Sequence, residues 1–267
     1  MKSQDLAEKV IQLRREVIDA LYAAQSGHPG SALSTMEMLV ALYYGEILKY
    51  DPQRPDWEDR DYFLLSNGHA CPALYVVLAE AGYFDAAELQ KLRQLGAGAQ
   101  GHPHRGSLPG VEISSGSLGQ GLSVGLGLAH ALKLQGRKNH VYVMMSDGEQ
   151  EEGSTWEAVM YAGKSGLDNL TAIIDKNQFQ IDGATADVMP SLDPLAEKYR
   201  AFNWEVQEID GHNFSEILPA LEQVTRPLAI ISHTIRGKGV SFMEGSTHWH
   251  AGAISAEQYE TAKNELA

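Results

Sequence analysis

Short apolar runs alternate along this chain with longer stretches in which apolar positions recur every three or four residues. Continuous apolar runs bounded by turn residues are typical of strands buried on both faces, whereas the longer spacing is typical of amphipathic helices. The runs predict strands at residues 62–65, 141–145, 170–174, 205–209 and 228–232. The helical spacing predicts helices at residues 6–21, 34–48, 72–82, 122–134, 154–165, 195–201 and 214–224.

Strands that alternate with helices favour an α/β fold in which helices cover both faces of a parallel sheet. A chain of 267 residues is long enough for one large domain of this kind, so we expect residues 1–267 to form a single domain. Residues 96–121 form a long glycine-rich segment without a helical or strand pattern. Loops of that length in compact domains are usually functional, so we expect this one to serve a site.

Two predicted strands end in polar residues that suit a hard cation. Asp147 follows the strand at 141–145, Gly148 lets the chain turn sharply, and Asn177 follows the strand at 170–174. The carboxyl ends of parallel strands meet at one edge of a sheet, where open α/β sheets bind ligands. Magnesium is usually held by one or two carboxylates together with substrate phosphates, so the pair predicts a magnesium-diphosphate site. Taken singly, both could be ordinary turn residues.

Composition narrows the possible partners. The formal net charge is −14 and the basic residues are scattered, which disfavours nucleic acid. The single cysteine, Cys71, excludes an internal disulfide and favours a reducing compartment. No apolar stretch approaches the roughly 20 residues that a membrane span needs, and residues 1–5 lead into an amphipathic helix rather than a signal sequence. We therefore expect a cytoplasmic protein that does not bind membranes.

The segment around Asp147 carries a resemblance. Asp147-Gly148, Glu152-Gly153 and Asn177 resemble the thiamine-diphosphate motif that begins with Gly-Asp-Gly and closes with Asn about thirty residues later. Further segments follow in the order typical of transketolases: SGHPG at 26–30, LSNGHA at 65–70, GHP at 101–103, PGVE at 109–112 and GSLGQG at 116–121. The chain thus resembles the thiamine-diphosphate-binding part of a transketolase. It departs at Ser146, where the family usually has Gly, and at Lys176, where many members have a second Asn.

The resemblance implies roles for particular residues. It implies that His28 and His102 contact the donor's oxygens above the thiazolium ring and that His69 contacts the diphosphate. The element at 247–250 is one residue shorter than in the family, so His250 is favoured there and His248 is held in reserve. The implied catalytic residues are His28, His102 and His250. The implied cofactor contacts are His69, Gly116, Ser117, Leu118, Asp147, Gly148, Glu152, Asn177, Lys238 and His250, and the implied metal ligands are Asp147, Asn177 and the backbone oxygen of Phe179.

Some of these residues also have a simpler interpretation. Histidines in Gly/Pro-rich loops are often merely solvent-exposed. The GSLGQG segment lacks the Lys-Ser/Thr ending of a nucleotide-binding P-loop. Glu149 and Glu151 are expected to be solvated residues on the approach to a helix, and Glu152 is assigned a structural or coupling role near the interface with a partner chain.

A complete transketolase is more than twice as long, and its pyrimidine-binding domain supplies the glutamate that activates the cofactor. We therefore expect a split enzyme in which a separate C-terminal subunit carries that domain, in an α2β2 heterotetramer. The expected reaction is transfer of a two-carbon ketol unit from a ketose donor to an aldose acceptor, with thiamine diphosphate and Mg²⁺, Ca²⁺ or Mn²⁺. The alternatives are a subunit of another thiamine-diphosphate enzyme, similar to deoxyxylulose-phosphate synthase or a 2-oxo-acid dehydrogenase, and a non-catalytic cofactor-binding paralogue. The sequence leaves open whether the sugars are phosphorylated, branched or sulfonated.

Overall fold

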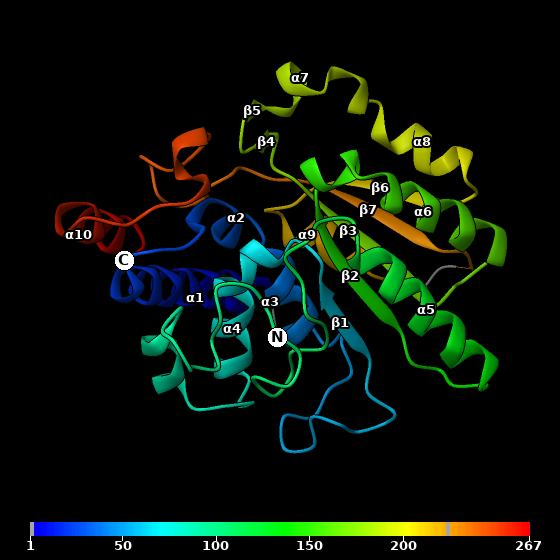
Figure 1. Cartoon of the computed structure of the whole chain (residues 1–267), viewed down its shortest axis with the longest axis horizontal. Coiled ribbons are helices and arrows are strands. Elements are labelled where there is room, and N and C mark those ends of the chain that lie inside the picture. The colour runs from blue at the N-terminus through cyan, green and yellow to red at the C-terminus, as the bar shows by residue number, and fades with distance from the viewer. Residues whose placement is uncertain (1–2, 223–224) are drawn as a thin grey trace.

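A five-stranded parallel sheet in the order β1-β2-β3-β7-β6 forms the centre of the molecule (Figure 1). The structure is a computed structural model that describes residues 3–222 and 225–267. The strands of this sheet are β1 Tyr62–Leu65, β2 Val141–Ser146, β3 Leu170–Lys176, β6 Glu205–Asp210 and β7 Leu228–His233. The five strands predicted from the apolar runs are confirmed, as is the parallel arrangement.

Both faces of the sheet are buried, which is why its strands appear in the sequence as continuous apolar runs. Side chains alternate between the two faces of a strand. In β2, Tyr142 and Met144 belong to one apolar core, while Val141, Val143 and Met145 belong to the other. A strand covered on both faces therefore needs apolar residues at every position rather than at every second one.

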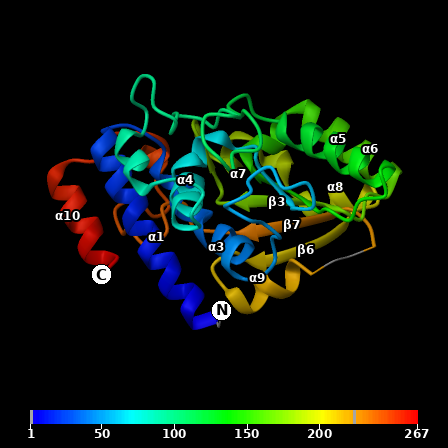
Figure 2. The same cartoon turned by 90° about the horizontal axis from the view of Figure 1, so that it is seen from below.

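The helices form a layer on each side of the sheet. In Figure 2, α5 and α6 lie above the strands and α3 and α9 lie below them. The core on the first side also includes side chains of α8, and the core on the second side includes side chains of α1, α4 and α10. The helices are α1 Ser3–Ala24, α2 Pro29–Ser34, α3 Met36–Tyr44, α4 Cys71–Glu80, α5 Gly121–Leu134, α6 Gly153–Ser165, α7 Thr185–Val188, α8 Leu195–Ala201, α9 Phe214–Ala220 and α10 Ala256–Glu265.

Four local features differ from the sequence prediction. The helix expected at 34–48 is the shorter α3, and α2 forms just before it, in a segment that was expected to be a loop. The helix predicted at 214–224 is α9, and its predicted end at Val224 lies outside the described residues. A short hairpin of β4 (Phe179–Gln180) and β5 (Gly183–Ala184) was not predicted, because two-residue strands carry no readable period. Helix α10 was missed because it is mostly polar; a capping box formed by Ser255 and Gln258 marks its start.

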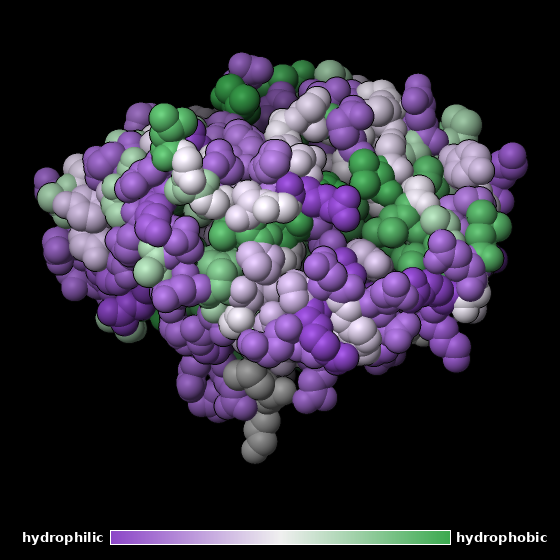
Figure 3. Space-filling model, turned by 60° about the horizontal axis from the view of Figure 1, so that its bottom comes forward, coloured by the Kyte–Doolittle hydropathy of each residue, from purple (hydrophilic) through white to green (hydrophobic). Residues whose placement is uncertain are grey.

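The distribution of polar and apolar side chains can be followed on one face of the molecule. The face drawn in Figure 3 is mostly hydrophilic, with apolar side chains gathered in a few patches. None of the helices within residues 3–222 and 225–267 is long and apolar enough to cross a membrane.

Candidate active site

A cavity of about 290 Å³ opens where the segments after β1, β2, β3 and β7 come together. Parallel strands leave the sheet at the same edge, so residues distant in sequence meet there. The walls of the cavity are formed by side chains and backbone of His28, Ser31, His69, His102, Gly116, Leu118, Ser146, Gly148, Glu151, Glu152, Asn177, Phe179, Gln180, Ile181, Asp182 and His250. Most of the positions predicted from the sequence to serve the cofactor or the reaction are among them.

Four histidines from four separate segments form a cluster in this cavity. The ring of His28 lies 5.5 Å from that of His69, 5.8 Å from that of His102 and 5.2 Å from that of His250, measured between ring centroids. His69 and His250 are 5.4 Å apart. Histidines that were merely solvent-exposed in separate loops would not be expected to cluster, so the cluster favours a shared role.

Local structure fixes each of these rings. His28 precedes α2, whose first residue is Pro29, and its Nδ1 atom is buried without a hydrogen-bond partner. His69 lies in a short 3₁₀ helix, Gly68–Ala70, and its Nε2 atom is 3.1 Å from Oγ of Ser31. His250 ends a second 3₁₀ helix, Thr247–His250. His248, two residues earlier, is exposed and packs its ring against Trp249, so the structure brings His250 and not His248 into the cavity.

The environment keeps these imidazoles neutral. Burial, together with the nearby His250 and His102, lowers the pKa of His28 to about 4. Burial and the positive charge of Arg236 lower the pKa of His250 to about 4. The pKa of His69 is also well below its ordinary value, again mainly because of burial. Neutral imidazoles can donate one hydrogen bond and accept another, which suits contacts to a cofactor and to sugar oxygens.

Asp147 and Asn177 lie at the ends of neighbouring strands, as the sequence predicts. Asp147 is fully buried, and its two oxygens accept hydrogen bonds from the backbone N–H groups of Gly148 (2.8 Å) and Gln178 (2.6 Å). Asn177 donates to a second buried carboxylate, Asp175, at 2.8 Å. Burial and the neighbouring Asp175 raise the pKa of Asp147 to about 7. Two buried acids so close together call for a compensating cation.

The oxygen donors fit magnesium better than zinc. Within the described part of the chain there is no cluster of three or more histidine, cysteine or acidic side chains placed to hold a metal ion. Instead, the carboxylate of Asp147 accepts a hydrogen bond from the Gln178 N–H at 2.6 Å, which places it beside the turn in which Phe179 N–H donates to Oδ1 of Asn177 at 3.2 Å. Such a set of oxygens is typical of a site that a cation and a diphosphate complete together.

The glycine-rich loop reaches the same cavity. Gly116 and Leu118 line it, whereas the exposed Ser117 is not among the lining residues. Glu152, the residue that precedes α6, also lines the cavity. Gly148 also lines the cavity, at the start of the 3₁₀ helix Gly148–Glu151.

The prediction that Glu149 is solvated is wrong. It was expected to be solvated, but its side chain is fully buried and accepts hydrogen bonds from Ser66, from the Gly119 N–H at 2.8 Å and from the Ser146 N–H at 3.2 Å. Glu151 was expected to be solvated as well; it is only partly exposed and lines the cavity. The reason is that the turn after β2 folds back under the glycine-rich loop, a contact that no local pattern reveals.

One basic residue in the site was missed and another was misplaced by sequence reasoning. Arg236 is almost fully buried; it donates a hydrogen bond to Nδ1 of His250 and another, at 3.4 Å, to the backbone oxygen of Gln180. Its charge also acts on Asp147. The only available signal was a basic residue between the end of β7 and Gly237, in the same segment as Lys238.

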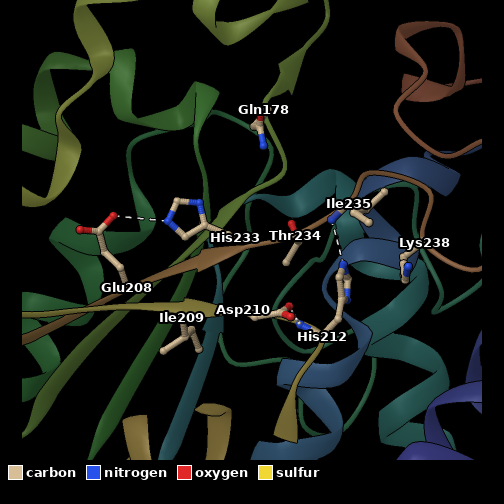
Figure 4. A pocket seen from close by; sticks show the side chains of 9 residues that line it. All are labelled: Gln178, Glu208, Ile209, Asp210, His212, His233, Thr234, Ile235 and Lys238. Carbon is tan, nitrogen blue, oxygen red and sulfur yellow. Dashed lines mark hydrogen bonds and ion pairs between the residues drawn. The ribbon is translucent and has the colours of Figure 1, made fainter. Parts of the chain in front are cut away.

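Lys238 does not reach the histidine cavity. It lines a separate pocket of about 560 Å³ outside the ends of β6 and β7, beside His212 and Ile235 (Figure 4). Its ammonium group is 3.5 Å from a carboxylate oxygen of Glu244. Lys238 therefore lies apart from the histidine cavity, and Arg236 is the basic residue of this segment that contacts His250 there.

Comparison with known proteins agrees with the site. Residues 6–267 match the family model described as transketolase, thiamine diphosphate binding domain. The chain is 42% identical to a subunit of the apulose-4-phosphate transketolase of Phocaeicola vulgatus, covering 95% of this chain and 91% of that protein. It is 41% identical to the 6-deoxy-6-sulfo-D-fructose transketolase subunit SqwG of a Clostridium species, covering 98% and 96%.

The fold is that of solved transketolases. The crystal structure of the transketolase from Campylobacter jejuni superposes with a TM-score of 0.93 at 33% identity, over the whole of this chain but only 43% of that one. The chain therefore spans less than half of the one-chain enzyme and nearly all of the separately encoded subunits. It belongs to the transketolase family, whose thiamine-diphosphate-binding domain it carries at the length of one subunit of a split enzyme.

Proposed function

We propose that this chain is the cofactor-binding subunit of a two-subunit transketolase that moves a two-carbon ketol unit from an anionic ketose to an aldose. The observation that carries the proposal is the cavity in which four histidines and Asn177 meet beside the buried Asp147. A non-catalytic paralogue would need only the residues that bind the metal and the diphosphate. It would not need His28 and His102, which are proposed to contact the sugar.

The residues around Asp147 fit the cofactor and its metal. The carboxylate of Asp147, the side-chain oxygen of Asn177 and the backbone oxygen of Phe179 would hold Mg²⁺, with Ca²⁺ or Mn²⁺ as substitutes. His69, Gly148 and Arg236 would contact the diphosphate, since Arg236 is a buried cation within electrostatic reach of Asp147. Gly116, Ser117 and Leu118 would face the aminopyrimidine with their backbone, and Glu152 would face the partner chain.

When bound, thiamine diphosphate would supply the nucleophilic carbon that transfer of a ketol unit requires. His28, His102 and His250 would then surround the oxygens of the sugar. Charge develops on the carbonyl oxygen as the new bond forms, and an imidazole N–H at that position stabilises it. Burial and the neighbouring Arg93 lower the pKa of His102, which favours a neutral imidazole that can donate one hydrogen bond and accept another.

The partner is proposed from the lengths of the relatives. Proteins named as transketolase subunits match this chain nearly end to end, whereas the one-chain transketolases continue well beyond it. We propose that a separate C-terminal subunit carries the pyrimidine-binding domain and its activating glutamate, that residues 1–267 form one diphosphate-binding domain, and that two copies of each chain form an α2β2 assembly. The proposed location is cytoplasmic, which the buried free thiol of Cys71 suits.

The test compares the chain alone with the chain captured together with its partner. Ketol transfer to ribose 5-phosphate is measured with thiamine diphosphate and Mg²⁺, using xylulose 5-phosphate, a branched ketose phosphate and a sulfonated ketose as donors. Activity in the captured complex only is expected, and the preferred donor then defines the substrate class.

Other outcomes would contradict parts of the proposal. Turnover by the chain alone would remove the need for a partner in catalysis. Pyruvate decarboxylation without ketol transfer would indicate a different thiamine-diphosphate enzyme. Absence of thiamine-diphosphate binding by the complex would point to the non-catalytic paralogue.

A further inference from the structure

Glu149 does not line the cofactor cavity, but its side chain contacts three of the segments that form the walls of the cavity. Its carboxylate accepts hydrogen bonds from the Ser66 hydroxyl after β1, from the Gly119 N–H in the glycine-rich loop and from the Ser146 N–H at the end of β2. Its own backbone N–H donates to Oγ of Ser146 at 3.3 Å.

Each of those segments carries a proposed cofactor contact. Three residues after Ser66 comes His69, Gly116 and Leu118 precede Gly119, and Asp147 follows Ser146. The proposed contacts span both ends of the cofactor, because His69 and Asp147 belong to the diphosphate site and the glycine-rich loop faces the aminopyrimidine. A change in the hydrogen bonds of Glu149 would therefore alter the spacing between the residues that contact the diphosphate and those that contact the aminopyrimidine.

Every polar group around the carboxylate is a donor. The two backbone N–H groups can only donate, and the Ser66 hydroxyl already accepts from the Gly121 N–H at 3.0 Å, which directs its own hydrogen toward Glu149. The ionised carboxylate satisfies all of them, and a neutral amide cannot, since its NH₂ group would face another donor. Burial raises the pKa of Glu149, and the hydrogen bonds from Ser66, Gly119 and Ser146 oppose that effect.

The loop has little freedom to find another position. Gly119 has φ +78°, and a Cβ atom there would lie 2.6 Å from Cβ of Glu152. A Cβ atom on Gly121 would lie 2.2 Å from Oγ of Ser66. The backbone thus passes so close to β1 and to the start of α6 that only glycine fits, and Ser154 completes the attachment by donating to the Gly119 carbonyl at 3.0 Å.

We propose that Glu149 is a positioning residue for thiamine diphosphate: its buried carboxylate fixes the glycine-rich loop against the ends of β1 and β2, and so sets the spacing between the aminopyrimidine and diphosphate contacts. This inference rests on the proposed function, and it predicts that a neutral replacement of the same shape weakens cofactor binding more than it slows the bound complex.

The first measurement uses the chain alone and needs no cofactor. Amide hydrogen exchange is followed in peptides that contain Gly119 and Gly121 for the wild type, Glu149→Gln and Glu157→Gln. Glu157 is an exposed acid on α6, so its variant makes the same change of charge without touching the loop. Exchange should become at least about 10-fold faster in Glu149→Gln only, while β3 peptides stay unchanged in all three proteins.

The second measurement uses the complex with its partner. The Kd of thiamine diphosphate, followed by calorimetry at saturating Mg²⁺, should rise at least about 10-fold in Glu149→Gln, whereas kcat at saturating cofactor should fall less than about threefold. Ser66→Ala, which removes one of three donors, should give a smaller change in the same direction. Glu149→Asp should restore part of the affinity, because it keeps the charge.

The two proposals fail in different ways. Exchange rates and cofactor Kd within twofold of wild type in Glu149→Gln would overturn the positioning role even in an active enzyme. A rise in Kd matched by an equal fall in kcat, together with faster exchange in β3, would also overturn it, since these changes indicate general loss of structure. A wild-type complex that binds no thiamine diphosphate would overturn the proposed function, while the exchange experiment would still decide whether Glu149 fixes the loop.

Discussion

The guanidinium of Arg236 donates a hydrogen bond to Nδ1 of His250 inside the cavity. A guanidinium has only donors, so Nδ1 must be the acceptor and the neutral imidazole carries its proton on Nε2. Arg236 packs closely against Gly30, where a Cβ atom would lie 2.7 Å from the Arg236 Nε. His250 is therefore presented to ligands as a fixed N–H donor, and Arg236 selects its tautomer.

Replacing Arg236 by Met should release His250 and remove a positive charge from the diphosphate site. Burial and, after it, the charge of Arg236 lower the pKa of His250, so removal of the charge should raise that pKa above about 4 while burial keeps it below its ordinary value, which NMR titration of the chain can follow. In the complex, kcat/KM should fall at least about 10-fold, as expected when a group that stabilises developing charge is lost. Lys238→Met is the matched control, since Lys238 lies in a different pocket. A larger loss in Lys238→Met than in Arg236→Met would contradict this assignment.

Replacing His102 by Ala should lower kcat of the complex about 10²-fold, the typical contribution of a positioned acid-base group. Among the four clustered rings, His102 contacts only that of His28, at 5.8 Å, so its removal should leave the other contacts in place. His248→Ala should leave kcat unchanged, because that exposed side chain lies outside the cavity. Steady-state kinetics of the two variants distinguish the roles; equal rates in wild type and His102→Ala would support a non-catalytic paralogue.

Lowering the pH should remove the stability that neutral histidines contribute to the folded chain. In the folded state the pKa values of His28 and His140 are about 4, below the ordinary value of about 6.5 for an unfolded chain. The unfolded state therefore binds more protons at these histidines between the two values, so their contribution is fully present above pH 6.5 and is lost as the pH drops toward 4, whereas the raised pKa of Asp147, about 7, acts in the opposite direction. The melting temperature, measured between pH 7 and pH 4, should therefore decline more in the wild type than in a variant that lacks one of these rings. His28→Asn should flatten the decline, and an unchanged slope would count against the burial of that ring.

Removal of divalent cations should abolish tight binding of thiamine diphosphate to the complex. Asp147→Asn should have the same effect with Mg²⁺ present, because the buried carboxylate is the charged member of the proposed ligand set. We expect cofactor affinity to fall at least about 100-fold in both cases, in line with the loss of a metal that bridges protein and phosphate. Calorimetric titration with and without chelator measures this, and chelator-resistant binding by the wild type would exclude the metal site.

Two glycines in neighbouring parts of the chain should respond oppositely to substitution by Ala. At Gly119 a Cβ atom would meet Glu152 and Ser154 within 2.7 Å at φ +78°, so Gly119→Ala should destabilise the chain by about 1–3 kcal/mol. At Gly127, inside α5, a Cβ atom would meet nothing within 4 Å, so Gly127→Ala should stabilise it by about 0.5–1 kcal/mol. Chemical denaturation of the chain compares the two; a stable Gly119→Ala would show that the loop can move away.

The sequence alone determined the layers of the fold and the chemistry of the cavity. Apolar runs revealed all five strands of the sheet because both of its faces are buried, and turn chemistry marked the point where Asp147 leaves β2. Motifs around His28, His69 and His102, together with the element at 247–250, identified all four clustered rings, because their neighbours in sequence form the segments that hold them.

Only the tertiary structure decided the rest. Whether Glu149 is solvated depends on Ser66, which lies 83 positions away in sequence, and the partner of His250 is Arg236, 14 positions earlier in the segment after β7. The choice of Arg236 over Lys238 depends on which side of the segment after β7 faces the cavity, and two basic residues with one glycine between them give no local sign of this. Local patterns report propensity and one-face burial, whereas the burial of a charge is decided by partners that the order of the sheet brings together.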